Sequence, residues 1–269
     1  MALCKDPVTQ DLNKRGYNLV KLPRVGIEPL DVLGLDGESM EKLGAISEVW
    51  TSPIAAPVPG APAAAAGING AKSSDIDVGI GLKLLSNALA GLGGGISLPS
   101  LTTAFKRARK IAFTFENVES TSISPFSLGK FLSQGTLDTA NPFVSQYFGN
   151  DETQEFIIFD VLKSDSLSVT VKGESGASVD ADIGALNGAL NANVKTTVGT
   201  AGSSEITFKG LTKVTFAFKV FQVIFANGKW TPQGVEANDR MSFAVDEDEA
   251  TAPNPAVVIN PSRLIKLKM

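Results

Sequence analysis

The clearest pattern along the chain is an alternation of apolar and polar residues over 166–209. In its first arm the odd positions from Leu167 to Ile183 are mostly apolar, and the even positions are mostly polar. After Asn187–Gly188, a dipeptide favoured in two-residue hairpin turns, the apolar residues occupy even positions from Leu190 to Phe208. This alternation predicts two strands, each with one apolar face.

A second region, residues 75–116, shows a related pattern. Even positions from Ile76 to Leu84 are apolar, and odd positions are apolar over 111–115, after four basic side chains within 106–110. Parts of both regions also fit an amphipathic helix, because apolar residues recur at helical spacing over 78–92 and 183–194. We interpret this double compatibility as refolding, from helices and short strands in solution to extended hairpins.

The length of these arms suits a membrane. Strands in globular proteins usually have about five or six residues, whereas an arm of about twenty residues extends roughly 65 Å at ~3.3 Å per residue. A tilted strand crosses a bilayer with ~9–11 residues, and such strands alternate apolar and polar positions. We therefore predict the following membrane-facing residues: Ile76, Val78, Ile80, Leu82, Ile111, Phe113, Phe115, Leu167, Val169, Val171, Val179, Ile183, Leu190, Val194 and Val198. An ordinary half-buried hairpin gives the same alternation, so a soluble sheet is the alternative.

Shorter signals predict the remaining elements. Asp6–Pro7 and the run Lys14–Arg15–Gly16 predict a helix over 7–15. A strand is expected over 17–22, ended by Pro23, and a turn-rich connection over 26–34. The Pro- and Ala-rich stretch 53–67 predicts a flexible surface loop.

The C-terminal part begins with an acidic, Pro-containing run, 246–255, that predicts an exposed linker. Cleavage by a protease is predicted within Asp246, Glu247, Asp248, Glu249, Ala250, Thr251 and Ala252. The segment beyond is apolar and basic, and we predict that Val257, Val258, Ile259, Leu264, Ile265 and Leu267 dock on the acidic body as an inhibitory segment. A final edge strand of the core is the alternative.

Composition restricts the chemistry. The chain has no histidine and one cysteine, which excludes Ser-His-Asp and Cys-His catalysis and zinc sites built on those residues. No carboxylate pair and no phosphate-binding glycine fingerprint is apparent. The net charge of −4 disfavours nucleic acid. We predict a protein that is not an enzyme and has no cofactor, metal ion or small-molecule substrate.

Targeting signals are also missing. The N-terminal residues lack the apolar region of a secretory signal, and no stretch of 18 apolar residues predicts a transmembrane helix. We therefore expect the inactive protein in the cytoplasm. Lipoprotein, myristoylation and prenylation signals do not explain Cys4.

The N-terminal residues resemble those of bacterial gasdermins. The resemblance is carried by Cys4, the short helix after it and the stretch Gly16 to Gly34 (GYNLVKLPRVGIEPLDVLG), and is most specific over 3–34. It implies a pore-forming effector of anti-phage defence, which a caspase-like protease activates by removing the C-terminal segment. The freed body is then expected to oligomerise and insert two hairpins per subunit into inner-membrane lipids. It also implies a palmitoyl group on Cys4.

Together these features predict an α+β fold, with a twisted, mostly antiparallel sheet and short surrounding helices in the inactive monomer. In the active form the amphipathic hairpins are expected to build a large membrane β-barrel. The expected organisation is a pore-forming domain over 1–245, a cleavable linker over 246–255 and an inhibitory segment over 256–269. The alternative function is a soluble, non-enzymatic, β-rich structural or binding module.

Overall fold

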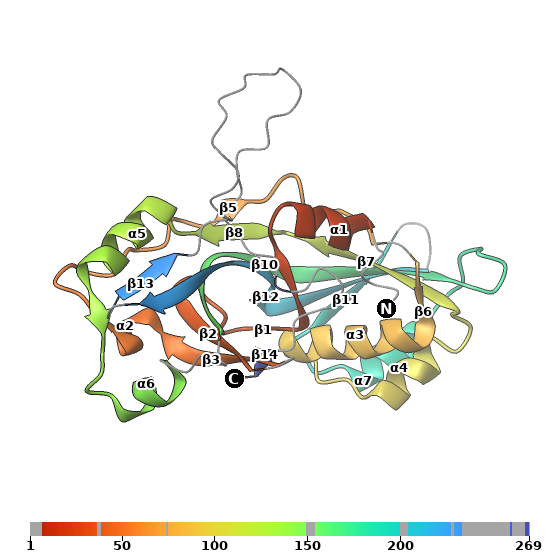
Figure 1. The fold of residues 1–269 in the computed structure, drawn as a ribbon. Helices are drawn as coiled ribbons and strands as arrows, with labels where there is room; N and C mark the ends of the chain where they lie inside the picture. Colours follow the sequence, from red (N-terminus) through yellow and green to blue (C-terminus); the bar gives the residue numbers. More distant parts are fainter. Residues whose placement is uncertain are drawn as a thin grey trace, which may run out of the picture.

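Two long strands, β10 (Gln154–Lys172) and β12 (Glu205–Ala226), form the centre of the protein (Figure 1). They pair antiparallel from Glu155 opposite Val223 to Thr170 opposite Glu205. The computed structural model describes residues 7–36, 39–73, 75–148, 154–199, 204–226, 229–232, 259 and 267–268. Within these ranges, the other strands of the large sheet join this central pair directly or through intervening strands.

The remaining strands extend both sides of the pair. Along β10 lie β2 (Asp31–Asp36), β8 (Glu119–Ser122) and β7 (Lys110–Glu116). Along β12 lie β1 (Asn18–Arg24), β11 (Lys195–Val198) and β13 (Lys229–Pro232). Farther out are β3 (Ser39–Ala45), β5 (Ala63–Ala64), β6 (Ile76–Asp77) and β14 (Leu267–Lys268). A separate small sheet joins β4 (Trp50–Thr51) to β9 (Thr136–Leu137).

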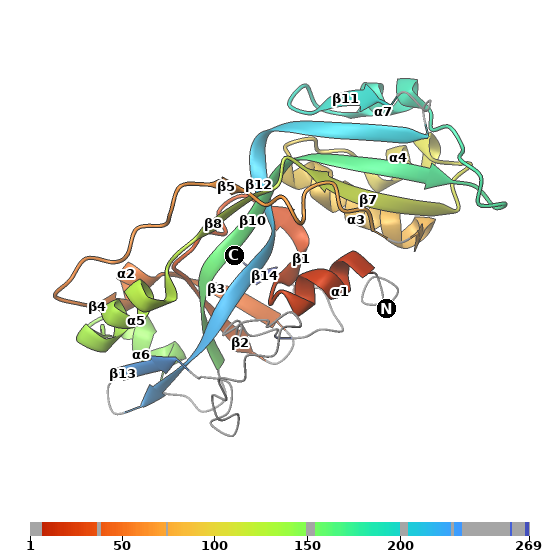
Figure 2. The same ribbon diagram turned by 90° about the horizontal axis from the view of Figure 1, so that it is seen from above.

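Both long strands change direction at the same level, as Figure 2 shows from above. Between the pairs Ser164–Val214 and Ser166–Lys209, β10 has one residue whereas β12 has four, Gly210 to Lys213. Such an irregularity bends a sheet. The bend separates a distal sheet (β6, β7, β11, residues 166–172 of β10 and 205–209 of β12) from a proximal sheet that contains the other strands of the large sheet.

The proximal sheet is buried on both faces. On one face, Ile157 and Phe159 pack among side chains of α2 (Ile46–Val49), α5 (Pro125–Gln134) and α6 (Pro142–Tyr147). On the other face, Phe156 and Ile158 pack with Phe218 and other apolar residues. Burial on both faces explains why this half of β10 is apolar almost throughout.

The distal sheet is covered on one face by α3 (Val78–Gly91), α4 (Leu98–Ala104) and α7 (Ile183–Ala189) (Figure 1). Local caps favour these helices: Asp77 accepts a hydrogen bond from the backbone of Gly79, and Asp182 from that of Ala185. Side-chain caps of this kind satisfy backbone donors that a helix leaves unpaired at its start.

The structure confirms the α+β fold with a mostly antiparallel sheet and short helices. The first helix also lies as expected, whereas several other local expectations are corrected. Helix α1 (Pro7–Lys14) lies where a helix was expected. Strand β1 continues through Pro23 to Arg24, because its register shifts after Leu19. Strand β2 begins inside the expected connection 26–34. The loop 53–67 lacks regular structure except for β5. Asn187–Gly188 lies in α7 rather than in a turn.

Helix α3 packs closely on β1, and we expect Gly91→Ala to destabilise the protein. A Cβ at Gly91 would overlap the carbonyl oxygen of Pro23 and lie 3.4 Å from Val214. The free energy of unfolding should fall by about 1–3 kcal/mol, the usual cost of overpacking. Urea unfolding measures it. The matched helical variant Gly129→Ala, with nothing within 4 Å of the new Cβ, should gain roughly 0.5–1 kcal/mol; equal effects would contradict the close packing.

Glu155 is buried in β10, and burial raises its pKa from 4.5 to about 7. Between these values the folded protein holds a proton that the unfolded chain releases, so stability should fall as pH rises from about 4.5 to about 7. Glu155→Gln should remove this fall and be more stable than the parent at pH 8 by roughly 1–3 kcal/mol. Urea titrations from pH 5 to 8 test this, with the exposed Glu41→Gln as control. A constant difference across this pH range would contradict it.

Candidate functional site

The predicted membrane-facing residues gather on the distal sheet and on the helices that cover it. Eight of them belong to one buried apolar cluster: Ile76, Leu82, Ile111, Phe113, Leu167, Val169, Val171 and Val194. Five are half-buried against that cluster: Val78, Phe115, Val179, Ile183 and Leu190. Ile80 and Val198 are exposed, with 41% and 39% of their surface accessible.

Strand register explains how residues distant in sequence reach one face. Phe113 of β7 lies opposite Val169 of β10, and Val169 lies opposite Ile206 of β12. Directly opposed residues point to the same side of a sheet, so the apolar side chains form a continuous surface under α3, α4 and α7. The other side is polar, and the Ser168 hydroxyl there donates to Glu116 at 2.6 Å.

The covering helix α3 approaches neighbouring strands closely where one of the two partners is a glycine. Gly81 faces Ile111, and a Cβ there would lie 3.1 Å from the Ile111 side chain. Leu92, which caps α3, faces Gly210 at the bend of β12, where a Cβ would lie 2.9 Å from the Leu92 carbonyl oxygen. Together with the contact between Gly91 and Pro23, these approaches tie α3 to β1, β7 and β12.

The described residues of the C-terminal segment dock on the proximal sheet. Leu267 is 2% exposed and packs with Val20, Met40 and other apolar residues, and Ile259 packs against the same cluster. β14 pairs parallel with β3, with Leu267 opposite Met40. The segment therefore contributes to the core of the described structure.

The same segment also contacts β1, at the opposite end of the sheet path from β3. The Arg24 guanidinium donates to the Leu267 carbonyl oxygen at 2.9 Å, and the Ile259 backbone N–H donates to Oδ1 of buried Asn18 at 2.8 Å. Figure 2 shows β14 beside β1 and β3. The C-terminal segment thus bridges the two ends of a curled sheet.

Several predicted site residues lie outside the described residues. They are Cys4, the cleavage region Asp246, Glu247, Asp248, Glu249, Ala250, Thr251 and Ala252, and four members of the predicted inhibitory segment, Val257, Val258, Leu264 and Ile265. Their predicted roles stay predictions.

A buried polar cluster near the bend was missed by the sequence analysis. Asp160 of β10 accepts hydrogen bonds of 2.7 Å from the hydroxyls of both Tyr17 and Ser120. The Lys219 ammonium lies 3.9 Å from Asp160 and 4.4 Å from the centre of the Tyr17 ring. Burial and the nearby Asp160 charge raise the pKa of Tyr17, whereas burial lowers the pKa of Lys219. Tyr17 and Asp160 are 143 residues apart, so no local pattern marks the cluster, which anchors the start of β1 to β10.

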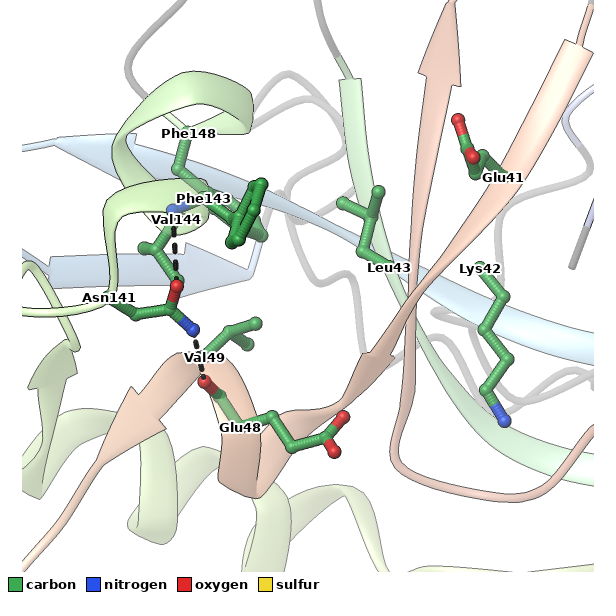
Figure 3. A pocket seen from close by; sticks show the side chains of 9 residues that line it. All are labelled: Glu41, Lys42, Leu43, Glu48, Val49, Asn141, Phe143, Val144 and Phe148. Carbon is green, nitrogen blue, oxygen red and sulfur yellow. Dashed lines mark hydrogen bonds between the residues drawn. The ribbon is translucent and has the colours of Figure 1, made fainter.

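An open cleft of about 480 Å³ lies at the end of the protein away from the distal sheet, between β3, α2 and α6 (Figure 3). Its wall includes Leu43, Val49 and Phe143. Its polar groups support the local backbone: Asn141 accepts from the backbone N–H of Phe143, and Glu48 accepts from that of Ala45. These two side chains therefore cap the starts of the helices beside the cleft, and the residues that line it form no recognisable catalytic arrangement.

The basic cluster 106–110 is exposed at the start of β7, and Lys106, Arg107, Arg109 and Lys110 all face solvent. Within the ranges that the structure describes, no three acidic, His or Cys side chains gather as metal ligands.

Among the described residues, no helix combines the length and the apolar character needed to cross a membrane.

Comparison with known proteins identifies the family. A sequence model described as the Bacterial Gasdermin Family matches residues 20–231. The chain belongs to the bacterial gasdermin family. It is 31% identical over 274 residues to "Gasdermin bGSDM" of Vitiosangium sp. (strain GDMCC 1.1324). This matched region covers 100% of this chain and 99% of that protein. "Gasdermin bGSDM" of Lysobacter enzymogenes is 29% identical over 258 residues, 94% of this chain and 93% of that protein.

A solved structure of a bacterial gasdermin from Bradyrhizobium tropiciagri has the same fold, with a TM-score of 0.67 at 16% identity over 98% of this chain and 96% of that one. The resemblance drawn from residues 3–34 is therefore confirmed. Gasdermin family and fold are consistent with a pore-forming protein.

Proposed function

We propose that this gasdermin is a latent pore-forming protein held inactive by its C-terminal segment. Cleavage within 246–252 by a caspase-like protease releases the segment. The remaining body then assembles with further copies of itself and inserts residues 75–116 and 166–209 into the inner membrane as hairpins. In this scheme the inactive protein is cytoplasmic, and pore formation kills a phage-infected cell.

The observation that carries this proposal is the docking of the described C-terminal residues, Ile259 and Leu267–Lys268, against both ends of the sheet. Leu267 fills a core position, and the described residues of the segment add the pairing of β14 with β3 and the hydrogen bonds to Asn18 and Arg24. These contacts are favoured while the chain is continuous, because the linker keeps the segment at a high effective concentration. A single cut removes that advantage.

Strand β1 connects the segment to the covering helices. On one side it provides Asn18 and Arg24 to the segment. At Pro23 its carbonyl oxygen lies against Gly91, at the end of α3. Release of the segment therefore removes support from the strand on which α3 rests, and α3 covers the apolar face of the distal sheet.

The surface of the resting protein suits an encounter with lipid. The four basic side chains of 106–110 are exposed, and anionic lipid attracts surface Lys or Arg by about 1 kcal/mol each. The acyl group implied for Cys4 would add a second, similarly weak membrane contact, and two such signals together give stable anchoring.

Leu267→Asp should activate the uncleaved protein. The new carboxylate cannot stay in the apolar cluster without a large desolvation cost, so the segment should dissociate and the intact chain should release dye from anionic vesicles at least tenfold faster than the uncleaved parent. Val25→Asp, which places the same charge on a side chain that is 54% exposed, should stay latent. A folded Leu267→Asp protein that remains silent would remove the inhibitory role of the segment.

Val198 and Thr197 provide a matched test of insertion. Both are exposed on β11 before cleavage, but they face opposite sides of the strand, and only Val198 is in the predicted lipid-facing set. After cleavage in the linker, Val198→Asp should reduce dye release at least tenfold, because a charge facing hydrocarbon costs about 2 kcal/mol for each subunit. Thr197→Asp should leak like the cleaved parent.

The parent protein provides the reference for these measurements. It should release no dye from vesicles before cleavage and should release dye after it. If the cleaved parent releases no dye, the proposed function is wrong. If it leaks and the two β11 variants leak equally, residues 166–209 do not insert with the predicted face toward lipid.

A further inference from the structure

Strand β1 is joined to the sheet by a short, interrupted ladder. Three described pairs connect it to β12: Asn18–Phe218, Leu19–Ala217 and Arg24–Thr215. Between the second and third pairs, β1 has four residues and β12 has one, which breaks regular pairing. One of the four is Pro23, which has no N–H to donate. Among the described strands, β12 is the only one that pairs with β1, so β1 depends strongly on its other contacts.

The C-terminal segment provides part of those contacts. The Ile259 N–H donates to the Asn18 side chain, and the Arg24 guanidinium donates to the Leu267 carbonyl oxygen. Val20 of β1 packs in the same apolar cluster as Leu267. All three contacts are lost when the segment leaves. The released body therefore keeps β1 as an edge strand with an incomplete ladder.

The strongest polar anchor that remains is Tyr17, the residue directly before β1. Tyr17 is 5% exposed, and its hydroxyl donates to Oδ2 of Asp160 in β10 at 2.7 Å. Its backbone N–H donates to the Leu12 carbonyl oxygen of α1 at 2.8 Å. Tyr17 thus ties both α1 and the start of β1 to the central pair of strands. Neither hydrogen bond involves the C-terminal segment, so cleavage leaves both in place.

The carboxylate of Asp160 has partners besides Tyr17. The Ser120 hydroxyl donates to Oδ1 at 2.7 Å, and the Lys219 ammonium lies 3.9 Å from Oδ2. If Tyr17 moves away, water replaces its hydroxyl at Oδ2, while Lys219 still balances the charge and Ser120 still satisfies the other oxygen. Opening therefore costs the net value of one hydrogen bond, and it leaves no unpaired buried charge, which would cost far more.

Movement of β1 would loosen the cover of the distal sheet. Pro23 lies against Gly91 at the end of α3, so closely that a Cβ at Gly91 would overlap the Pro23 carbonyl oxygen. Such an approach leaves α3 no room to slide or rotate while β1 stays in place. Departure of β1 removes this obstacle from a helix that covers the apolar face.

We propose that Tyr17 and β1 form a second latch: the hydrogen bond from Tyr17 to Asp160 keeps the start of β1 on the central strands after cleavage, and this contact must open before a pore forms. The inference rests on the proposed function and adds a step between release of the segment and insertion. Two consecutive residues carry the two latches, since Asn18 binds the segment and Tyr17 binds Asp160. The second latch sets the rate of pore formation once the first is gone.

Ala217 allows a matched disulfide test of this step. It lies opposite Leu19 of β1 on one side and opposite Leu162 of β10 on the other. Opposed Cα atoms lie ~4.5–5.5 Å apart, within disulfide range. Leu19→Cys/Ala217→Cys ties β1 to β12, whereas Leu162→Cys/Ala217→Cys ties the two central strands to each other. The single variants measure any cross-link to Cys4.

Each variant is prepared as the full chain with a specific protease site in the linker, oxidised, cleaved, and added to vesicles of phosphatidylethanolamine, phosphatidylglycerol and cardiolipin. The 19/217 disulfide should reduce dye release at least tenfold, and dithiothreitol should restore it. The 162/217 disulfide should leave release within about twofold of its reduced form. If the 19/217 disulfide does not slow release, or both disulfides slow it equally, the second latch is wrong and the proposed function stands. If the cleaved parent does not leak, both fail.

Tyr17→Phe tests the latch without a cross-link. It removes the hydroxyl and keeps the ring, so the cleaved variant should release dye at least fivefold faster than the cleaved parent, because a hydrogen bond to a charged group changes an equilibrium by roughly tenfold or more. Before cleavage it should stay silent, since the segment still holds β1.

The matched control for this variant is Ser164→Ala. It also removes a buried hydroxyl, but the partners of Ser164 are the backbone of Glu116 and Ser166, away from β1. The cleaved control should leak like the cleaved parent. A rate for cleaved Tyr17→Phe no higher than that of cleaved Ser164→Ala would overturn the role of Tyr17.

Discussion

The antiparallel ladder between β10 and β12 determines where the neighbouring strands and the covering helices lie. On the distal side of the bend it gathers Leu167, Val169, Val171, Ile206 and Phe208 on one face. Each such side chain contributes about 1.5–3 kcal/mol when buried, so the face cannot remain open in water. Helices α3, α4 and α7 exist as helices largely because they cover it, and their position follows from the ladder.

The contacts that the described residues of the C-terminal segment make are of modest strength. One buried leucine contributes about 2–3 kcal/mol, and each hydrogen bond to Asn18 and Arg24 about 1 kcal/mol. In the proposed scheme, the covalent tether adds to these contacts by keeping the segment at a high effective concentration. Strand β1 carries Asn18 and Arg24, which contact the segment, and its Pro23 lies against Gly91 of α3, so it contacts both the segment and a helix that covers the distal sheet.

Much of the distal sheet was predictable because its signal is local. The alternation around Val169 and Phe208 identifies both strands and their shared face. The helices α3 and α7 were predictable only as one of two structures, since Asp77 and Asp182 can cap a helix just as the same apolar residues can form a strand. The bend, the strand β2 and the Tyr17–Asp160 contact depend on partners distant in the sequence, which no single window contains.

Where the large sheet ends on β5, β6, β11 or β14, the outermost strand has only two to four residues. Short outer strands offer few unpaired backbone groups, and Lys195 on β11 adds a charge that a neighbouring sheet would have to bury. At these four places the resting sheet therefore offers little template for pairing with the sheet of another copy. The long strand β10 is paired with β12 on one side and with β2, β8 and β7 on the other, so its great length creates no long open edge.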